Sequence, residues 1–309
     1  MIIHSGLTDL RLTNPVVTMG VFDGIHRGHR SLIDYVVRRA GEMKGESVII
    51  TFDPPPRLVL ENNKEGLSFL LSPDEKTDIL RKLNVDHLVI IEFTLAFSRT
   101  RACDFVGDVL VKKIGTRHLI VGYDHHFGYR GEGNYRTIQQ CAVSMGFDVE
   151  QFREVQAEEG AISSSLIRGS LLRGKIEDAT RWLGYHYSLR GTVVEGRKLG
   201  RELGFPTANI KPAYDFKLIP GDGVYAVEVL TGDIRRPGML SIGTNPTINN
   251  SGDKRSIEVN IFNLDNDLYG STIEVIFRYR LRDEIKFSSI RQLASQMELD
   301  KAMTLKLLS

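Results

Sequence analysis

The chain has 309 residues, of which 41% are hydrophobic and 26% charged, and its formal net charge is +1. This length favours two domains of ordinary size, and the balanced charge excludes the basic excess of a nucleic-acid-binding protein. The sequence contains neither an apolar run of membrane-spanning length nor a signal-peptide pattern, so we expect a cytoplasmic protein that does not contact membranes.

The two cysteines are Cys103 and Cys141. They have neither the spacing of metal ligands nor the pattern of a disulfide framework. We therefore expect two separate thiols, as is usual in a reducing cytoplasm.

Up to about residue 183, apolar runs typical of strands alternate with segments of helical periodicity. The expected strands are Val16–Phe22, Ser47–Phe52, His87–Glu92, Arg117–Gly122 and Phe147–Phe152. The expected helices are Leu32–Met43, Asp74–Leu83, Arg101–Ile114 and Tyr135–Met145. This alternation predicts right-handed βαβ units and a parallel sheet covered on both faces. Ligands of such sheets bind beyond the carboxyl ends of the strands.

The first expected strand leads into residues 20–29, which read Gly-Val-Phe-Asp-Gly-Ile-His-Arg-Gly-His and precede a helix. The glycines of this turn are Gly20, Gly24 and Gly28. They allow backbone N–H groups to approach a phosphate at the positive end of the helix dipole. His26 and His29 lie three residues apart around the helix start, so both imidazoles can face one anion. Two unrelated surface histidines are the alternative, which the complete ten-residue pattern disfavours.

This turn resembles the signature of the nucleotidylyltransferase superfamily, and its detailed form is similar to the FMN adenylyltransferase branch. The resemblance implies that FMN attacks the α-phosphorus of ATP and that pyrophosphate leaves. It makes His26 and His29 catalytic. It assigns to the ATP phosphates Gly20, Phe22, Asp23, Gly24 and Gly28.

A second anion site is expected where residues 162–168 open a helix with three serines. Hydroxyls, free backbone N–H groups and the Arg168 guanidinium can converge there on one phosphate, although an ordinary capped helix has the same pattern. The segment resembles the family's Ser-x-x-Ile-Arg motif. The resemblance assigns Ser164 and Ser165 to the ATP phosphates and Arg168 to catalysis.

The run Val121–Arg130 ends an expected strand with a glycine-rich loop and resembles the family's Val-Gly-x-Asp/Asn-Phe-x-Phe-Gly run. The resemblance places Asp124 and Phe127 at the flavin. His125 stands where the family usually has phenylalanine. The earlier segment Thr51–Pro56 resembles the family's Thr-Phe-x-Pro-His-Pro loop, and in it Pro55 stands where histidine is usual.

From Leu189 the pattern changes to short β-rich segments separated by turn residues, and a long amphipathic helix follows from Ser288 or Ser289 to about Leu308. The expected strands are Leu189–Glu195, Thr207–Ile210, Val224–Leu230, Met239–Ile242, Ile257–Phe262 and Thr272–Phe277. Closely spaced strands without intervening helices predict a small antiparallel barrel. We place the domain boundary near Gly184–Ser188, with domains 1–184 and 185–309.

A glycine-rich, basic loop within residues 191–210 can wrap phosphates, although a β-hairpin turn has a similar composition. Thr207 and Asn209 alternate along one expected strand. Their hydroxyl and amide therefore lie on one face, where they can share a Mg²⁺-nucleotide.

This stretch resembles the riboflavin kinase motif Gly-x-x-x-Gly-Arg-x-Leu-Gly-x-Pro-Thr-Ala-Asn, and the resemblance continues to the terminal helix. It implies that Thr207 and Asn209 bind Mg²⁺. The residues that it assigns to ATP and its phosphates are Gly196, Gly200, Arg201, Gly204, Pro206, Thr207 and Asn209. It makes Glu258 the base that accepts the proton of the riboflavin 5′-hydroxyl and places Arg282 at the flavin. Asn260 stands where the family usually has histidine.

Together the two signatures identify the chain as a member of the bacterial bifunctional FAD synthetase family. The resemblance implies an α/β plus β fold, with a Rossmann-like sheet in the adenylyltransferase domain and a Greek-key barrel with a terminal helix in the kinase domain. The expected ligands are riboflavin, FMN, ATP and Mg²⁺, with no nucleic acid and no obligate protein partner.

Two other functions remain as alternatives. One is a related nucleotidylyltransferase that acts on a phosphopantetheine-like or phosphocholine-like acceptor, which the kinase motifs disfavour. The other is a flavin-binding or regulatory protein with one decayed site, which the intact His26, His29, Arg168, Thr207, Asn209 and Glu258 disfavour.

Overall fold

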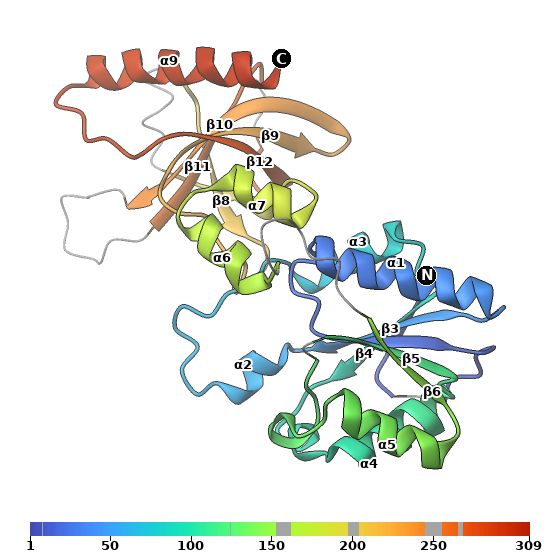
Figure 1. Ribbon diagram of the computed structural model, residues 1–309. Helices are drawn as coiled ribbons and strands as arrows, with labels where there is room; N and C mark the ends of the chain where they lie inside the picture. Colours follow the sequence, from blue (N-terminus) through green and yellow to red (C-terminus); the bar gives the residue numbers. More distant parts are fainter. Residues whose placement is uncertain (8, 124, 153–161, 197–203, 245–254, 265–267) are drawn as a thin grey trace. The chain divides into compact units, whose positions relative to one another are not determined.

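The computed structural model describes residues 1–7, 9–123, 125–152, 162–196, 204–244, 255–264 and 268–309 (Figure 1). The chain folds as two compact units. The first comprises Met1–Leu67 and Leu71–Ser163, and the second comprises Ser68–Leu70 and Ser164–Ser309. The predicted boundary at residues 184 and 185 stays a prediction.

The first unit contains a six-stranded sheet with strand order β1-β4-β3-β2-β5-β6, in which every neighbouring pair is parallel. Its strands are β1 (Ile2–Ser5), β2 (Val16–Met19), β3 (Ser47–Asp53), β4 (His87–Glu92), β5 (His118–Gly122) and β6 (Asp148–Phe152). The central strands β2 and β3 are buried, as expected of a sheet covered on both faces. The predicted parallel α/β sheet is confirmed. Strand β1 was not predicted, because it is a short, largely exposed edge strand.

Helices cover both faces of this sheet. They are α1 (Arg27–Glu42), α2 (Pro56–Leu60), α3 (Pro73–Lys82), α4 (Ala102–Phe105), the π-helical η2 (Val106–Ile114) and α5 (Tyr135–Met145), with 3₁₀ turns η1 (Phe97–Arg99) and η3 (Tyr129–Gly131). Figure 1 shows α1 and α3 on one side and α4 and α5 on the other. The start of α3 is fixed by a capping box between Ser72 and Glu75.

The two cysteines are joined in a disulfide between α4 and α5, with their Cα atoms 6.0 Å apart. The expectation that Cys103 and Cys141 are separate thiols was therefore wrong. The residues are separated by 38 positions, and they meet because the elements that carry them pack on the same core around Phe105, Val106 and Ile138. Such long-range packing leaves no trace in the spacing of the cysteines.

The main segment of the second unit begins with α6 (Ser164–Leu172) and α7 (Ile176–Leu183) and then forms a closed barrel. The barrel strands are β7 (Ser188–Val194), β8 (Ala208–Pro212), β9 (Gly223–Thr231), β10 (Ile234–Thr244), β11 (Arg255–Ile261) and β12 (Thr272–Arg282). They close in the order β10-β11-β8-β7-β12-β9, and neighbouring strands are antiparallel. The predicted antiparallel barrel is confirmed.

Alternating side chains fill the barrel. Strand β7 alternates between partly exposed and buried residues along its whole length, and Tyr225 and Phe277 are among the largest fully buried side chains. The segment Ser68–Leu70 packs with this unit, since Phe69 pairs with Lys217 and the Lys217 ammonium donates to the Leu70 carbonyl at 2.8 Å.

The terminal helix α9 (Ile290–Leu308) begins at the N-cap Ser289, as predicted. Its buried residues include Asp300, which accepts hydrogen bonds from the Arg282 Nε and Nη2 atoms. Leu299 and Met303 are 64% and 50% exposed. The helix is thus anchored partly by an ion pair rather than by its apolar residues alone.

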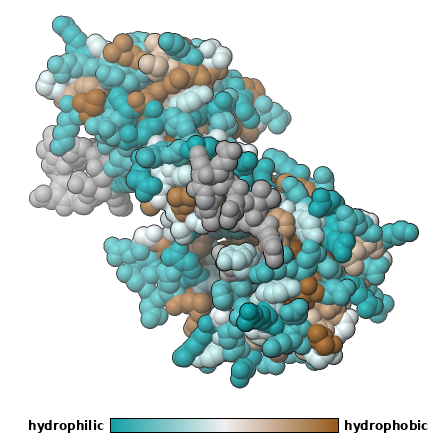
Figure 2. Space-filling view, in the orientation of Figure 1, coloured by the Kyte–Doolittle hydropathy of each residue, from teal (hydrophilic) through white to brown (hydrophobic). Residues whose placement is uncertain are grey.

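The visible surface of the molecule is mostly hydrophilic, with hydrophobic residues in scattered patches (Figure 2). Within the described residues, none of the helices combines the length and the apolar character that crossing a membrane requires.

Candidate active sites

The turn between β2 and α1 has an unusual backbone. Gly24 has a φ of +88°, which favours glycine, but Phe22 and Ile25 also have positive φ values, of +50° and +35°. Both side chains are buried, at 3% and 0% exposure. Packing of these two side chains therefore holds a strained turn in place, a feature common at functional sites.

The two predicted histidines lie together at the start of α1. Their rings stack with centroids 3.7 Å apart, and the His26 Nδ1 atom accepts a hydrogen bond from the His29 backbone N–H at 3.3 Å. Because Nδ1 is the acceptor, a neutral His26 carries its proton on Nε2, which is then a donor. His26 is the helix N-cap, in place of the usual small polar residue.

His29 is an uncharged donor or acceptor in this setting. Burial, the neighbouring His26 and the charge of Lys76 lower the pKa of His29 well below its ordinary value of 6.5. Its Nδ1 atom is buried and has no hydrogen-bond partner within the described residues. A buried polar atom of this kind is expected to meet a ligand or water.

Two other predicted residues of the turn, Phe22 and Gly20, shape it through contacts of the Phe22 ring. Phe22 contacts the His29 ring edge-on, with centroids 5.3 Å apart, and a Cβ at Gly20 would lie 3.2 Å from the Phe22 ring. Asp23 is buried at 7% exposure. Phe22 therefore contributes by packing, whereas Gly20 keeps the backbone open.

A cavity of about 670 Å³ adjoins this turn and includes Gly20 and Val21 in its lining. Aromatic side chains from several elements make up much of the wall: Phe52, Phe93, Phe97, Phe105 and Phe127. Its size and lining suit a large planar ring. The predicted flavin residue Phe127 lies in this wall, whereas Asp124 lies outside the described residues.

His125, which replaces the usual phenylalanine, also lines the cavity and stacks on Phe127 with ring centroids 5.9 Å apart. It thus keeps a flat ring in the wall. Phe52, Phe93, Phe97 and Phe105 were missed in the sequence, because they come from separate elements and belong to no common motif.

The predicted serine and arginine residues lie on α6. Arg168 donates from Nη2 to the Ser165 hydroxyl at 2.9 Å, and Ser164 is the first residue of the helix. This helix belongs to the second compact unit.

A second candidate site lies on the barrel, where Thr207, Asn209 and Glu258 come together. Thr207 donates from Oγ1 to the Glu258 Oε2 atom at 3.3 Å, and Asn209 is the register partner of Glu258 across β8 and β11. The antiparallel pairing thus brings together residues that are about fifty positions apart in the sequence.

Gly196 lies directly against Asn209. A Cβ at position 196 would come within 1.8 Å of the Asn209 Nδ2 atom, so a larger residue would displace the amide. Gly204 has a φ of +79° and is exposed. The predicted Gly200 and Arg201 lie outside the described residues.

Asn260, the departure from the family pattern, supports this site. Its Nδ2 atom donates to the Pro206 carbonyl at 2.7 Å, and the side chain is only 6% exposed. Pro206 directly precedes Thr207, so Asn260 positions the strand entry that carries the Thr207 hydroxyl.

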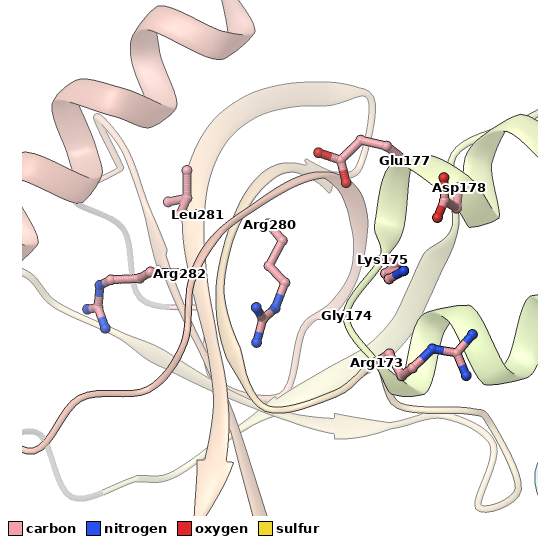
Figure 3. Close-up of a pocket in the computed structure, with 8 residues that line it drawn as sticks. All are labelled: Arg173, Gly174, Lys175, Glu177, Asp178, Arg280, Leu281 and Arg282. Carbon is pink, nitrogen blue, oxygen red and sulfur yellow. The ribbon is translucent and has the colours of Figure 1, made fainter.

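Arg282 is held by the carboxylate of Asp300 at 2.8 Å, with its guanidinium near the Phe287 ring. It also lines a pocket of about 430 Å³, together with residues of β12 and of the α6–α7 region. In Figure 3, Arg280 lies between Arg282 and the α7 residue Glu177. Because Asp300 holds the Arg282 guanidinium, any contact of Arg282 with a flavin would be made while this ion pair is in place.

Comparison with known proteins gives two family matches that together span most of the chain. The sequence model of the FAD synthetase family matches residues 9–166, and that of the riboflavin kinase family matches residues 183–308.

Whole-length relatives agree with this pair. The bifunctional riboflavin kinase/FMN adenylyltransferase of Listeria monocytogenes is 36% identical, over 94% of this chain and 91% of the relative. Its Escherichia coli counterpart is 34% identical, over 93% and 90%. A crystal structure described as a macrolide-efflux protein from Streptococcus pneumoniae has a TM-score of 0.89 and 31% identity, and covers 98% of this chain and 99% of that one.

Proposed function

Because the chain belongs to the family of bifunctional riboflavin kinases and FMN adenylyltransferases, we propose an assignment of its two reactions to the two sites described above. The enzyme phosphorylates riboflavin to FMN and adenylylates FMN to FAD. The histidine turn, which is the turn between β2 and α1 with His26 and His29, serves FAD formation. The site formed by Thr207, Asn209 and Glu258 serves FMN formation. The observation that carries this assignment is the aromatic cavity whose lining includes Gly20 and Val21, at the start of the turn that leads to His26 and His29.

FAD formation follows from the position of the cavity beside the turn. The isoalloxazine ring of FMN binds among the aromatic side chains, and the FMN phosphate then lies near the turn. An FMN phosphate oxygen attacks the α-phosphorus of ATP, the bond to the β-phosphate oxygen breaks, and pyrophosphate leaves. His26 donates from Nε2 and the neutral His29 donates one further hydrogen bond, which stabilises charge on the phosphates. Arg168, Ser164 and Ser165 bind the ATP phosphates.

FMN formation relies on the carboxylate of Glu258. It accepts the proton of the riboflavin 5′-hydroxyl as that oxygen attacks the γ-phosphorus of ATP, and ADP leaves. The hydrogen bond from Thr207 fixes the orientation of the carboxylate. Residues 196–209 bind the nucleotide, with Gly196 leaving room for Asn209.

The donors at this site fit Mg²⁺. The Thr207 hydroxyl and the Asn209 amide supply oxygen ligands of the kind that this ion binds, and Gly196 leaves the Asn209 amide in place. We assign Mg²⁺ to Thr207 and Asn209. When bound, the ion neutralises charge on the ATP phosphates.

We further propose that both reactions take place in the cytoplasm and need no nucleic acid, membrane or protein partner. The support is the nature of the substrates, which are small molecules and ATP.

One incubation tests this assignment against the alternatives. The protein is mixed with riboflavin, ATP and Mg²⁺, and the flavins are separated by chromatography over time. FMN that appears first and FAD that follows support two working sites. FMN without FAD indicates a decayed adenylyltransferase site, and neither product indicates another acceptor or a binding role. Omitting Mg²⁺, with a chelator present, should abolish the kinase reaction.

A further inference from the structure

Helix α3 carries a buried lysine that no motif of the sequence includes. Lys76 is 8% exposed and lies one turn before the core residue Leu80 on the same helix. Its Nζ atom donates to the Val21 carbonyl at 2.7 Å and to the Thr51 hydroxyl oxygen at 3.2 Å. Val21 directly precedes Phe22 in the strained turn.

An ammonium in this position is costly. Burial lowers the pKa of Lys76 to about 8, although the carboxylates of Asp23 and Asp53 act in the opposite direction. A leucine or methionine would fill the same space without burying a charge. The position therefore indicates a need for a cationic donor beside the turn.

We propose that Lys76 is a positioning residue for FAD formation, which fixes the Val21 carbonyl and thereby the turn from Gly20 to His29. The proposal rests on the assignment of this turn to adenylyl transfer. Lys76 does not need to touch a substrate in this role.

Two physical effects follow from the contact. In a trans peptide the C=O and N–H groups point in opposite directions, so holding the Val21 carbonyl toward Lys76 directs the Phe22 N–H away from it and fixes the peptide that enters the turn. The positive charge also offsets Asp23, which would otherwise repel phosphates, and it favours the neutral form of His29.

The test compares Lys76→Met with Lys82→Met, a matched change at an exposed lysine of the same helix. For Lys76→Met we expect kcat for FAD formation from supplied FMN to fall by about 10- to 100-fold, the effect of losing a charged hydrogen bond to the Val21 carbonyl, although the Thr51 hydroxyl still donates to that carbonyl at 3.4 Å. The KM for FMN should change less than kcat, and FMN formation from riboflavin should be unaffected. Lys76→Arg should recover part of the loss, and Lys82→Met should behave as wild type.

Unchanged FAD formation in Lys76→Met would overturn the proposal, provided that His29→Ala loses it. If His29→Ala also keeps FAD formation, the assignment of the turn is wrong instead.

The pH profile of the wild-type enzyme decides the case even if Lys76→Met does not fold. The charged groups that act on Lys76 are Asp23 and Asp53, and Lys76 in turn acts on His29. Because Lys76 loses its proton near pH 8, FAD formation should decline above that pH while FMN formation on the same sample does not. In Lys76→Arg the decline should move to higher pH. A wild-type profile without this selective decline would refute the proposal.

Discussion

The Thr207 hydroxyl donates a hydrogen bond to the Glu258 carboxylate, with Oγ1 and Oε2 3.3 Å apart. The contact orients the carboxylate that we propose as the proton acceptor. Strand pairing creates it, since β8 and β11 run antiparallel and place Glu258 opposite Asn209. Loss of the carboxylate should therefore affect one of the two reactions only.

We expect Glu258→Gln to lower FMN formation by about 10²- to 10⁴-fold, because the amide keeps the volume but cannot accept the proton. Conversion of supplied FMN to FAD should not change. Glu274→Gln, which removes an ion pair with Arg190 in the same barrel, is the matched control. A normal rate of riboflavin phosphorylation in Glu258→Gln would show that the base lies elsewhere.

His29→Ala should lower FAD formation by about 10²- to 10³-fold, as expected when a preorganised donor to a phosphate is removed. FMN formation should stay near the wild-type rate. His4→Ala changes a histidine of the same unit that contacts His87 and serves as the control. Equal loss of both activities in a folded His29→Ala variant would contradict the two-site assignment.

The depressed pKa of His29 predicts how stability depends on pH. Below the unfolded-state pKa of 6.5, the unfolded chain binds a proton that the folded chain does not. The free energy of unfolding should therefore decrease as the pH falls through 6.5. Thermal unfolding of wild type and His29→Ala at a series of pH values checks this. The variant should show a shallower decrease, and parallel curves would exclude His29 as the cause.

Asn260→Asp should weaken the kinase site, because it removes the donor to the Pro206 carbonyl and puts a carboxylate in its place. We expect riboflavin phosphorylation to fall by about tenfold, corresponding to a loss of about 1.4 kcal/mol. Asn260→His can keep a ring N–H donor and should stay close to wild type. If both variants match the wild-type kcat, Asn260 has no part in positioning Thr207.

Fragments test the proposed domain boundary. Residues 185–309 contain the barrel and its proposed site, whereas residues 164–309 add α6 and α7, which pack on the barrel through contacts such as the Gly221 N–H with the Leu171 carbonyl at 2.8 Å. Both fragments should phosphorylate riboflavin, and the longer one should unfold at a higher temperature. A folded fragment of residues 164–309 without kinase activity would show that the site is incomplete.

Regular patterns in the sequence predicted most of the fold. The period of the apolar residues predicted the parallel sheet and the barrel, and continuous motifs supplied the residues that we propose for the two sites. Strand β2 was predicted to extend to Phe22 but ends at Met19, because the positive φ values of the turn interrupt it.

Features that depend on contacts between distant segments could not be predicted. Lys76 occupies an apolar position of a helix, and only the fold shows that its ammonium reaches the Val21 carbonyl. The aromatic cavity and the disulfide likewise join side chains from separate elements. A lysine in the apolar stripe of an amphipathic helix is the one signal that the sequence offered.

Closure of the barrel has a consequence for synthesis on the ribosome. Strand β7 pairs with β12, whose residues lie about 80 positions later in the chain. The six strands of the parallel sheet are complete at residue 152, so the first unit can fold while the remainder is still being made. The barrel must wait until β12 has left the ribosome. Under the proposed assignment, a message cut short before that strand would yield a chain able at most to convert FMN supplied by another source.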